Sequence, residues 1–390
     1  NKGALDGMVA LYASQGKWRE VVNVFARRVK QSNDIAPRIE MLRRVARTLD
    51  DKAKDVDGAI NAYKRILELD GKDGGALRDL ADILEREQRW QQLVNILKRH
   101  EEVAQSREDK LAIRYRVGGL WEQELDNPEQ AIAVYRSILD EEPGHLLSLK
   151  ALERLFTTLN RPQELVNIFE KMLKHAPSQE EAVRLLFKIG ATWEESLEDS
   201  AMAVDANQRV LQADANNVHA VENLERLHRA RSEWDQLVKA YETHISLTRD
   251  PAEIVGLYLS IGQVYAQELG RTDKAEQMYN AALDFDPGSQ DAIHSLGALY
   301  EKSGNWFNAL EKLQAEAQLL GASKEAVEIY HRIGNINEQM LLDVGNAVLA
   351  YKAALDIEPS HVPSVQALKN IALQKNDNTD YLHWLREEAK

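Results

Sequence analysis

Histidines and recurring carboxylates are the residues of this 390-residue chain whose chemistry suits a metal site or acid–base catalysis. Of the ten histidines, His294 and His331 are the one pair that the spacing places at equivalent positions of neighbouring segments. A protein zinc site needs three or four ligands, and no third ligand accompanies this pair. We therefore interpret the two histidines as polar surface residues, and we predict neither a metal site nor a cofactor.

Carboxylates recur at one register, at Asp50, Glu122, Glu194 and Glu338. Paired catalytic carboxylates need a shared pocket that moves their pKa values apart. A catalytic residue is usually unique, whereas a residue repeated at a constant spacing is usually structural, so we interpret these four as a solvated or ion-paired ridge. The chain also lacks the glycine-rich phosphate loops, the two-histidine zinc helix and the serine elbow of common enzymes. We predict that it is not an enzyme.

Composition narrows the classes of partner. The chain has 63 Asp and Glu against 49 Lys and Arg, a net charge of −14, so we predict no nucleic-acid partner, because phosphate contacts need a basic face. It has no Cys, which excludes disulfides and thiolate metal sites. It has no long apolar run, so we predict no membrane insertion. It begins without an initiator Met or a signal peptide, so we expect it to start inside a longer or processed protein, and no compartment is predicted.

The strongest pattern is an internal repeat whose period equals the spacing from Trp18 to Trp90. Trp234 and Trp306 keep the same spacing, and Pro162 occupies the skipped position midway between Trp90 and Trp234. Since Pro suits the first turn of a helix, we expect a helix to begin there. Three further rows keep this period without an insertion or deletion: Gly118, Gly190, Gly262 and Gly334; Ala59, Ala131, Ala203, Ala275 and Ala347; Leu80, Leu152, Leu224, Leu296 and Leu368.

The sequence within each period of the repeat predicts two helical hairpins. Apolar residues recur at i, i+3, i+4 and i+7, as on one face of a helix, and the Leu80 row is expected to be buried. Gly16 and Gly304 separate the helices within a hairpin, whereas Pro143 and Pro287 close hairpins. Four residues at one register predict helix N-caps, and three of them precede an acidic residue by three positions: Asp34, Ser106, Ser178 and Asp250.

These residues resemble the tetratricopeptide repeat family over essentially the whole chain. The family's pattern of Leu-Gly, Tyr, Gly, aromatic and small residue is matched by Leu296, Gly297, Tyr300, Gly304, Trp306 and Ala309. A second match is formed by Gly118, Trp121, Ala131, Tyr135 and Pro143. The chain departs from the pattern where the small residue is Leu93, Leu165 or Leu237 and where the Gly is Glu153 or Glu225. We expect those hairpins to be more widely spaced than is usual in the family.

The resemblance implies an all-α fold, a right-handed α-solenoid of about eleven helical hairpins arranged as a double repeat. The double repeats are expected at 1–72, 73–144, 145–216, 217–288 and 289–360, followed by a partial repeat at 361–390.

In the family, the first helix of each hairpin lines a concave groove in which extended peptides bind. Carried over to this chain, the resemblance places an apolar row beside a basic band in that groove. The apolar row is Tyr115, Phe187 and Leu259, and the basic band is Arg44, Arg78, Arg116, Lys150, Arg154, Arg184, Lys188, Arg226 and Arg332. Because the Arg fork holds a carboxylate at two points, we predict that the ligand is an extended acidic and apolar segment. Alternatively, the apolar row packs between hairpins and the basic residues pair with the carboxylate ridge.

We predict that the chain is a protein–protein interaction scaffold with a protein or peptide partner. The first and last helices lack an obvious polar capping face, which solenoids normally need. One alternative function is therefore an architectural subunit that stacks through its ends, by end-to-end or homo-oligomeric contacts. Another alternative is the regulatory repeat segment of a larger enzyme.

Overall fold

The computed structural model describes residues 2–388, which form α-helices and short π-helices and contain no strand. The predicted all-α class is therefore confirmed. The chain divides into two compact units, Asn1–Glu198 and Asp199–Lys390, which we call the N-terminal unit and the C-terminal unit. The double-repeat blocks stay a prediction as domains.

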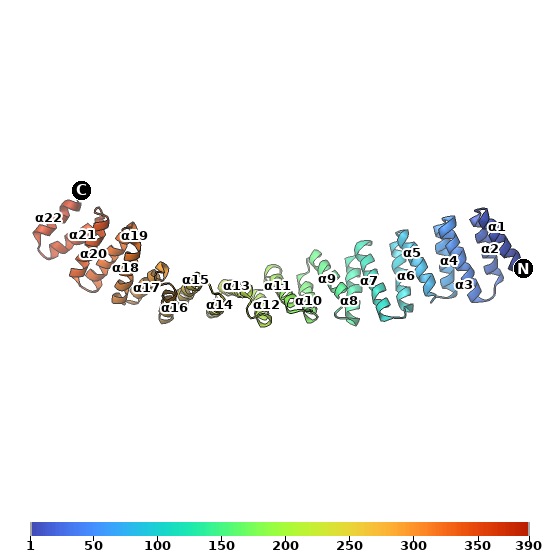
Figure 1. Cartoon of the computed structure of the whole chain (residues 1–390), viewed down its shortest axis with the longest axis horizontal. Helices are drawn as coiled ribbons and strands as arrows, with labels where there is room; N and C mark the ends of the chain where they lie inside the picture. The colour runs from blue at the N-terminus through green and yellow to red at the C-terminus, as the bar shows by residue number, and fades with distance from the viewer. Residues whose placement is uncertain (1, 389–390) are drawn as a thin grey trace. The chain divides into compact units, whose positions relative to one another are not determined.

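The N-terminal unit consists of helices that pack against their neighbours in chain order (Figure 1). Its helices are α1 (Lys2–Ser14), α2 (Trp18–Gln31), α3 (Ile35–Arg47), η1 (Thr48–Ala53), α4 (Val56–Leu69), α5 (Gly74–Arg86), α6 (Trp90–Val103), α7 (Arg107–Gln123), α8 (Pro128–Glu141), α9 (Leu146–Thr158), α10 (Pro162–Lys174), α11 (Gln179–Ala191) and η2 (Thr192–Ser196). The odd-numbered α-helices are the first helices of the predicted hairpins, and the even-numbered α-helices are the second.

The C-terminal unit follows the same plan (Figure 1). Its helices are α12 (Ser200–Ala213), α13 (Val218–Ala230), α14 (Trp234–Leu247), α15 (Pro251–Gln263), η3 (Val264–Glu268), α16 (Thr272–Phe285), α17 (Gln290–Ser303), α18 (Trp306–Leu320), α19 (Lys324–Asn335), η4 (Ile336–Met340), α20 (Val344–Ile357), α21 (Val362–Gln374) and α22 (Asn378–Glu388). Within each unit the stacked helix pairs form an α-solenoid, in which each pair buries its apolar face against the next pair.

The predicted core and the predicted helix starts are confirmed. All five residues of the Leu80 row are buried. Five second helices begin at the positions that the sequence marks, namely Trp18, Trp90, Pro162, Trp234 and Trp306.

Three of the four predicted N-caps are confirmed. The Ser106 and Ser178 hydroxyls accept hydrogen bonds from the N–H groups of Asp109 and Glu181, and the Asp250 carboxylate accepts one from Ala252. The prediction for Asp34 is wrong in one respect. Asp34 lies at the N-cap of α3, but its side chain makes no capping hydrogen bond.

A residue with positive φ, in most cases not glycine, lies within three residues after each first helix or after the π-helical turn that follows it. Gly304 has φ 74° and lets the N–H of Asn305 donate to the Tyr300 carbonyl, at 2.9 Å, which is a common helix C-terminal motif. The other residues with positive φ at such ends are Gly16, Lys54, Gln88, Asp126, Asn160, Glu198, Ser232, Gly270, Leu342 and Asn376. Four of these ends are preceded by a π-helical turn, η1 to η4. The sequence marks only the glycines among them.

Candidate partner-binding face

The predicted binding residues lie on the first helices of the hairpins, as expected. In the N-terminal unit they lie on α3, α5, α7, α9 and α11, and in the C-terminal unit on α13, α15 and α19. Because side chains three or four residues apart share a helix face, Lys150 and Arg154 lie on one face of α9. We call the solvent-facing side of these helices the first-helix face.

Several basic residues of this face pair with an acidic residue on the first helix of the preceding hairpin. Arg116 of α7 lies 2.6 Å from the Glu85 carboxylate of α5, and Arg154 of α9 lies 2.7 Å from Glu122 of α7. Lys188 of α11 repeats the arrangement with Glu153 of α9, at 2.7 Å.

The same pairing occurs in the C-terminal unit. The Arg332 Nε atom of α19 lies 3.0 Å from a Glu301 carboxylate oxygen of α17. These ion pairs are partly solvated, so each contributes only about 0.2–1 kcal/mol. Their main effect is to neutralise most of the predicted basic band.

Two further basic residues pair within their own helix. Arg44 lies 2.7 Å from Glu40, and Arg184 lies 2.5 Å from Glu181, in each case about one turn earlier. Such exposed pairs hold the guanidinium close to its own helix and offer little charge to a ligand.

Arg78 of α5 and Lys150 of α9 differ from the rest of the band. Both side chains are exposed, they lie one period apart at one register, and within residues 2–388 neither has a hydrogen-bond or ion-pair partner. The charge of these two residues is therefore available on the first-helix face. Arg226 is exposed on α13 at the register of Arg154.

The apolar row is partly buried. The Tyr115 ring lies 5.4 Å from the Tyr135 ring and 6.0 Å from the His145 ring. Phe187 is half-buried on α11, and Leu259 packs against the buried residues of its own unit. The row thus contributes to packing between helices while keeping part of its surface exposed.

The more exposed apolar residues of this region were missed by the sequence reasoning. Leu146 and Leu147 are the first residues of α9, and both are exposed. Leu147 lies one turn before Lys150, on the same face. A pair of adjacent leucines at a helix start breaks the helical apolar pattern, and this signal in the sequence could have identified them.

The carboxylate ridge is tied into the structure. The Tyr135 hydroxyl donates a hydrogen bond to Glu122 at 3.1 Å, and Tyr351 donates one to Glu338 at 2.7 Å. Burial, together with the adjacent Glu122 carboxylate, raises the pKa of Tyr135, so its hydroxyl stays protonated and keeps donating. Asp50 pairs with Arg86. These contacts agree with the interpretation of the ridge as structural.

The two predicted histidines have separate partners. His294 lies 2.7 Å from Glu316, whereas the His331 ring lies 5.3 Å from the His361 ring and its Nδ1 lies 3.1 Å from the Ser364 hydroxyl. Within residues 2–388, no group of three or more His, Asp or Glu side chains is placed to hold a metal ion.

None of the described helices is both long and apolar enough to cross a membrane.

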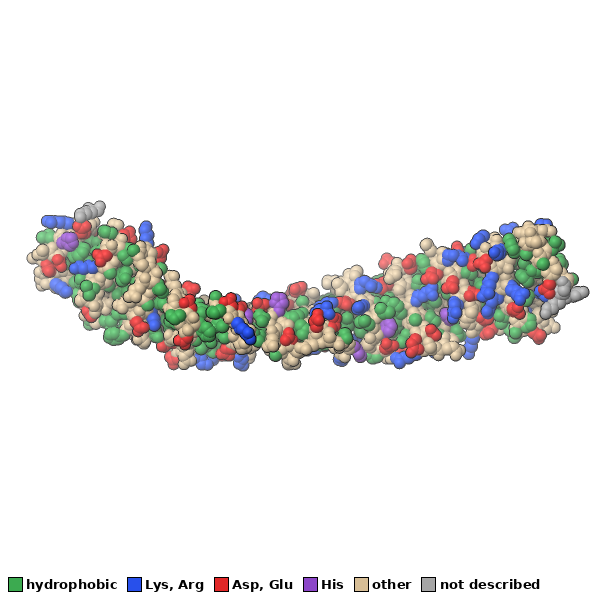
Figure 2. All heavy atoms as spheres, in the orientation of Figure 1, with side chains coloured by type: hydrophobic (Ala, Val, Ile, Leu, Met, Phe, Trp, Pro, Cys, Tyr) green, Lys and Arg blue, Asp and Glu red, His purple; other side chains and the backbone are tan. Residues whose placement is uncertain are grey.

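Charge is divided unevenly between the units. The N-terminal unit has 32 Lys and Arg against 34 Asp and Glu, whereas the C-terminal unit has 17 against 29. Figure 2 shows Lys and Arg side chains gathered over helices α3 to α6 on the face in view. The acidity of the whole chain therefore belongs mainly to the C-terminal unit.

Comparison with known protein families gives one consistent result. Family profiles described as tetratricopeptide repeat match residues 76–111, 148–187, 220–254 and 255–289. The first three matches begin at successive periods of the repeat found within the chain.

One curated relative and two solved structures illustrate the similarity. The human protein O-mannosyl-transferase TMTC1 is 28% identical over 166 residues, which cover 42% of this chain and 18% of that protein. A crystal structure of MamA protein is 21% identical, covers 46% of this chain and 94% of its own, and has a TM-score of 0.34. The APC/C hetero-tetramer Cut9–Hcn1 contains a chain that is 14% identical, with coverages of 99% and 92% and a TM-score of 0.27.

Proposed function

The chain belongs to the tetratricopeptide repeat family, whose repeats generally serve as protein-interaction scaffolds and are generally non-catalytic, and from that premise we propose a specific ligand. The first-helix face of the N-terminal unit binds an extended segment of another protein that carries both acidic and apolar side chains. The absence of an enzymatic activity stays a prediction.

The observation that carries this proposal is the pair of unpartnered cations. Arg78 and Lys150 are exposed in a unit whose other basic residues on this face are largely ion-paired. Leaving two cations without partners at one register gives no stability to the fold. A ligand carboxylate at each position would form a charge-assisted hydrogen bond, which is stronger than a neutral one.

The apolar part of the ligand is supported by the leucines at the start of α9. Leu146 and Leu147 are exposed next to Lys150, and the partly exposed Tyr115 ring lies against His145, which immediately precedes Leu146 in the chain. Exposed apolar surface beside a cation suits a segment in which Leu or Phe alternates with Asp or Glu.

The test uses charge reversal on two faces of the same unit. Peptides are selected from a random phage-displayed library on the intact chain, and their affinity is measured by fluorescence polarisation. We expect acidic and apolar peptides whose binding weakens at least about tenfold in the Arg78→Glu, Lys150→Glu double variant and weakens with added salt.

The matched control is the Lys64→Glu, Lys171→Glu double variant. Both residues are exposed on second helices of the same unit, α4 and α10, so the change in net charge is identical. Equal losses of affinity in the two double variants, with unchanged helical circular dichroism, would show that net charge rather than the first-helix face governs binding.

A further inference from the structure

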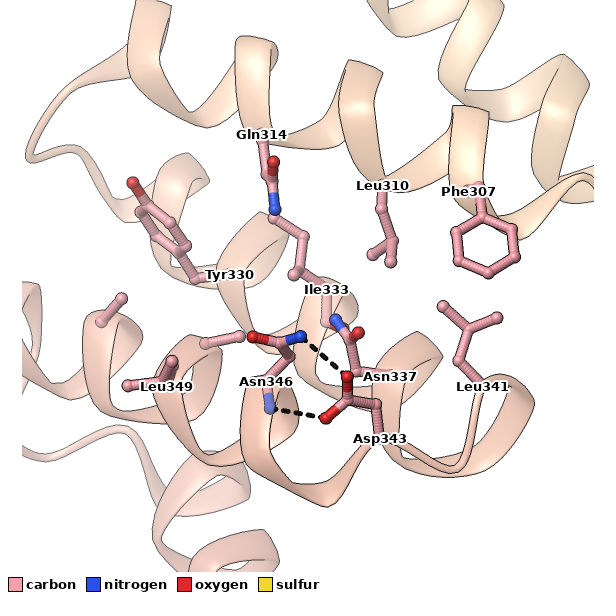
Figure 3. Close-up of a pocket in the computed structure, with 12 residues that line it drawn as sticks. Phe307, Leu310, Gln314, Tyr330, Ile333, Asn337, Leu341, Asp343, Asn346 and Leu349 are labelled. Atoms are coloured by element: carbon pink, nitrogen blue, oxygen red, sulfur yellow. Dashed lines mark hydrogen bonds between the residues drawn. The ribbon is translucent and has the colours of Figure 1, made fainter.

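A groove in the C-terminal unit lies between the second helices α18 and α20, with α19 and η4 beneath it (Figure 3). Its volume is about 520 Å³. It is lined by Phe307, Leu310, Gln314, Tyr330, Ile333, Asn337, Leu341, Asp343, Asn346, Leu349, Ala350 and Ala353. We call it the α18–α20 groove, and it lies in the C-terminal unit, whereas the acidic segment is proposed to bind the N-terminal unit.

The groove is apolar at both ends and polar in the middle. Figure 3 shows Phe307 and Leu341 facing each other at one end, with Tyr330 and Leu349 at the other end. Phe307 is 76% exposed and Leu349 is 66% exposed. Gln314 and Asn337 lie between the ends, beside Leu310 and Ile333, so amide groups stand among apolar side chains in the middle of the groove (Figure 3).

The repeat supplies an internal comparison for these positions. The lining recurs four periods earlier, where Val22, Ala26, Leu42 and Leu49 line a smaller groove in the N-terminal unit. The residues equivalent to Phe307 in the four earlier periods are Arg19, Gln91, Gln163 and Asp235. Those equivalent to Leu349 are Asn61, Ala133, Asp205 and Gln277.

The earlier periods indicate whether the fold requires large apolar side chains at these two positions. The same hairpins form with polar side chains, charged side chains or alanine at both positions, so packing does not require Phe307 or Leu349. Large apolar side chains that stay exposed in water are unfavourable, and a bound partner that covers them removes their surface from water. The fifth period alone has a large apolar residue at both positions.

The floor of the groove also differs in this period. Asn337 replaces a large apolar side chain that the earlier periods supply as Leu49, Trp121, Trp193 and Tyr265. Asn337 is 4% exposed, and its Nδ2 donates to the Ile333 carbonyl at 2.9 Å. In the part of the chain that the structure describes, its Oδ1 accepts no hydrogen bond. This oxygen is not one of the fully buried unpartnered polar atoms in that part of the chain, so solvent reaches it, and a donor from an occupant can take the place of that solvent.

We propose that the α18–α20 groove binds a basic, apolar segment of a partner protein, which inserts two large apolar side chains and donates a hydrogen bond to Asn337. Asp343 is the one ionised residue of the lining, and the surrounding unit has 17 basic against 29 acidic residues. Lys or Arg next to the apolar side chains complements that charge and speeds association.

The Asp343 carboxylate is the N-cap of α20, and this contact fixes its position. It accepts hydrogen bonds from the N–H and the Nδ2 of Asn346, at 3.0 and 2.8 Å (Figure 3). These bonds keep the pKa of Asp343 below its usual range, so the negative charge is present at neutral pH. The segment expected here is basic, opposite in charge to the one proposed for the N-terminal unit.

The test exchanges the distinctive residues for those of the earlier periods. Peptides are selected on the intact chain from a random phage-displayed library, and each is measured by fluorescence polarisation. We expect a class of peptides with Leu, Met or Phe next to Lys or Arg. Their affinity should fall at least about tenfold in the Phe307→Gln, Leu349→Asn double variant, which carries the side chains of Gln91 and Asn61.

Two further variants keep the outcome interpretable. Asn337→Tyr restores the ring that Tyr265 supplies one period earlier, so it should retain the fold and remove binding of the same peptides. Phe285→Gln removes an exposed aromatic residue of α16 outside the groove and should leave their affinity unchanged.

Three outcomes would overturn the proposal. The first is that no enriched peptide depends on Phe307 and Leu349 although both proteins are folded by circular dichroism. The second is that acidic peptides are the ones that depend on them. The third is concentration-dependent sedimentation that Phe307→Gln abolishes, because the occupant would then be a second copy of the chain. None of these results bears on Arg78 and Lys150, so the two proposals fail independently.

Discussion

His331 of α19 and Tyr115 of α7 occupy the same register of the repeat, and their surroundings match closely. The Tyr115 ring lies 5.4 Å from Tyr135, and the His331 ring lies 5.3 Å from Tyr351, with the same interplanar angle of 43°. Each ring also lies near a histidine, His145 or His361. The structure therefore accepts a tyrosine or a histidine at this register, but only the histidine titrates near neutral pH.

His331 should make the stability of the C-terminal unit depend on pH. Burial, and then the neighbouring His361, lower the pKa of His331, while Glu328 and Glu338 oppose this to a smaller extent. A histidine with a lowered pKa is protonated first in the unfolded chain, so its contribution to stability is full above about pH 6.5 and declines as the pH falls below it. In urea denaturation, wild type should lose more stability than His331→Tyr between about pH 7.5 and about pH 5.5.

The carboxylates of the chain are unchanged in this variant, so their contribution cancels in the comparison. Equal losses of stability in the two proteins would mean that His331 titrates like a solvated imidazole.

At the scale of the helix, a close contact joins the two helices of a hairpin. A Cβ atom at Gly118 of α7 would lie 2.5 Å from the Tyr135 ring of α8, so only glycine allows this approach. Gly262 with Tyr279 and Gly334 with Tyr351 repeat the contact in the C-terminal unit. The contact therefore explains the glycine at these three positions.

Two adjacent glycines of α7 should respond in opposite directions to the same substitution. Gly118→Ala should destabilise the protein by about 1–3 kcal/mol, because the new methyl group overpacks against Tyr135. Gly119→Ala should stabilise it by up to about 1 kcal/mol, because alanine favours the helix and the nearest atom to its Cβ, the Tyr135 hydroxyl oxygen, is 4.0 Å away.

Chemical denaturation of both variants measures these differences. Ala46 occupies the register of Gly118 one period earlier, so we expect a cost near the lower end, about 1 kcal/mol. Stabilisation by Gly118→Ala would show that the hairpin opens freely at this contact.

Helix starts were predictable from the sequence, and helix ends were less so. Trp18, Pro162 and the N-cap serines mark starts because a side chain there either fits the first turn or bonds to it. The ends of the first helices are formed by a left-handed residue, which is glycine in some hairpins but Leu342 or Asn160 in others. The π-helical turns before four of these ends leave the apolar periodicity nearly unchanged, so the sequence does not reveal them.

At the scale of the whole molecule, the helices that carry the predicted binding residues were easier to predict than the contacts of those residues. The first-helix placement of Arg116 and Lys188 follows from the repeat register. Their ion pairs with Glu85 and Glu153 join residues on successive hairpins, and these depend on how the hairpins stack, which periodicity does not give. The α18–α20 groove was not predicted because a repeat pattern consists of the residues that the periods share. Phe307, Asn337 and Leu349 of this groove differ from the residues at the same positions of the earlier periods.

Stability should be local along the chain, because each hairpin contacts only its neighbours. Leu296 is 0% exposed and lies in a cluster with Ile261 and Tyr300. Leu296→Ala should cost about 2–5 kcal/mol, the range for a truncated buried Leu. By hydrogen exchange, the amides of the C-terminal unit around α15 to α18 should lose protection, while those of the N-terminal unit keep theirs.

The control is the same substitution at an exposed position. Leu373 of α21 is 58% exposed, so Leu373→Ala should change stability by less than about 0.5 kcal/mol. Loss of protection throughout both units in Leu296→Ala would show that the chain unfolds as one cooperative body.

Successive hairpins differ in sequence, and the pattern returns only at every second hairpin, which has a consequence for the gene. Duplication or deletion of one whole period places each first helix beside a neighbour of the original type, so that ion pairs such as Arg116–Glu85 and Lys188–Glu153 can form again. A segment of half that length brings two hairpins of one type together and leaves the ion pairs and ring contacts at that junction without counterparts. Insertion or removal of a whole pair of hairpins should therefore preserve the fold better than insertion or removal of a single hairpin.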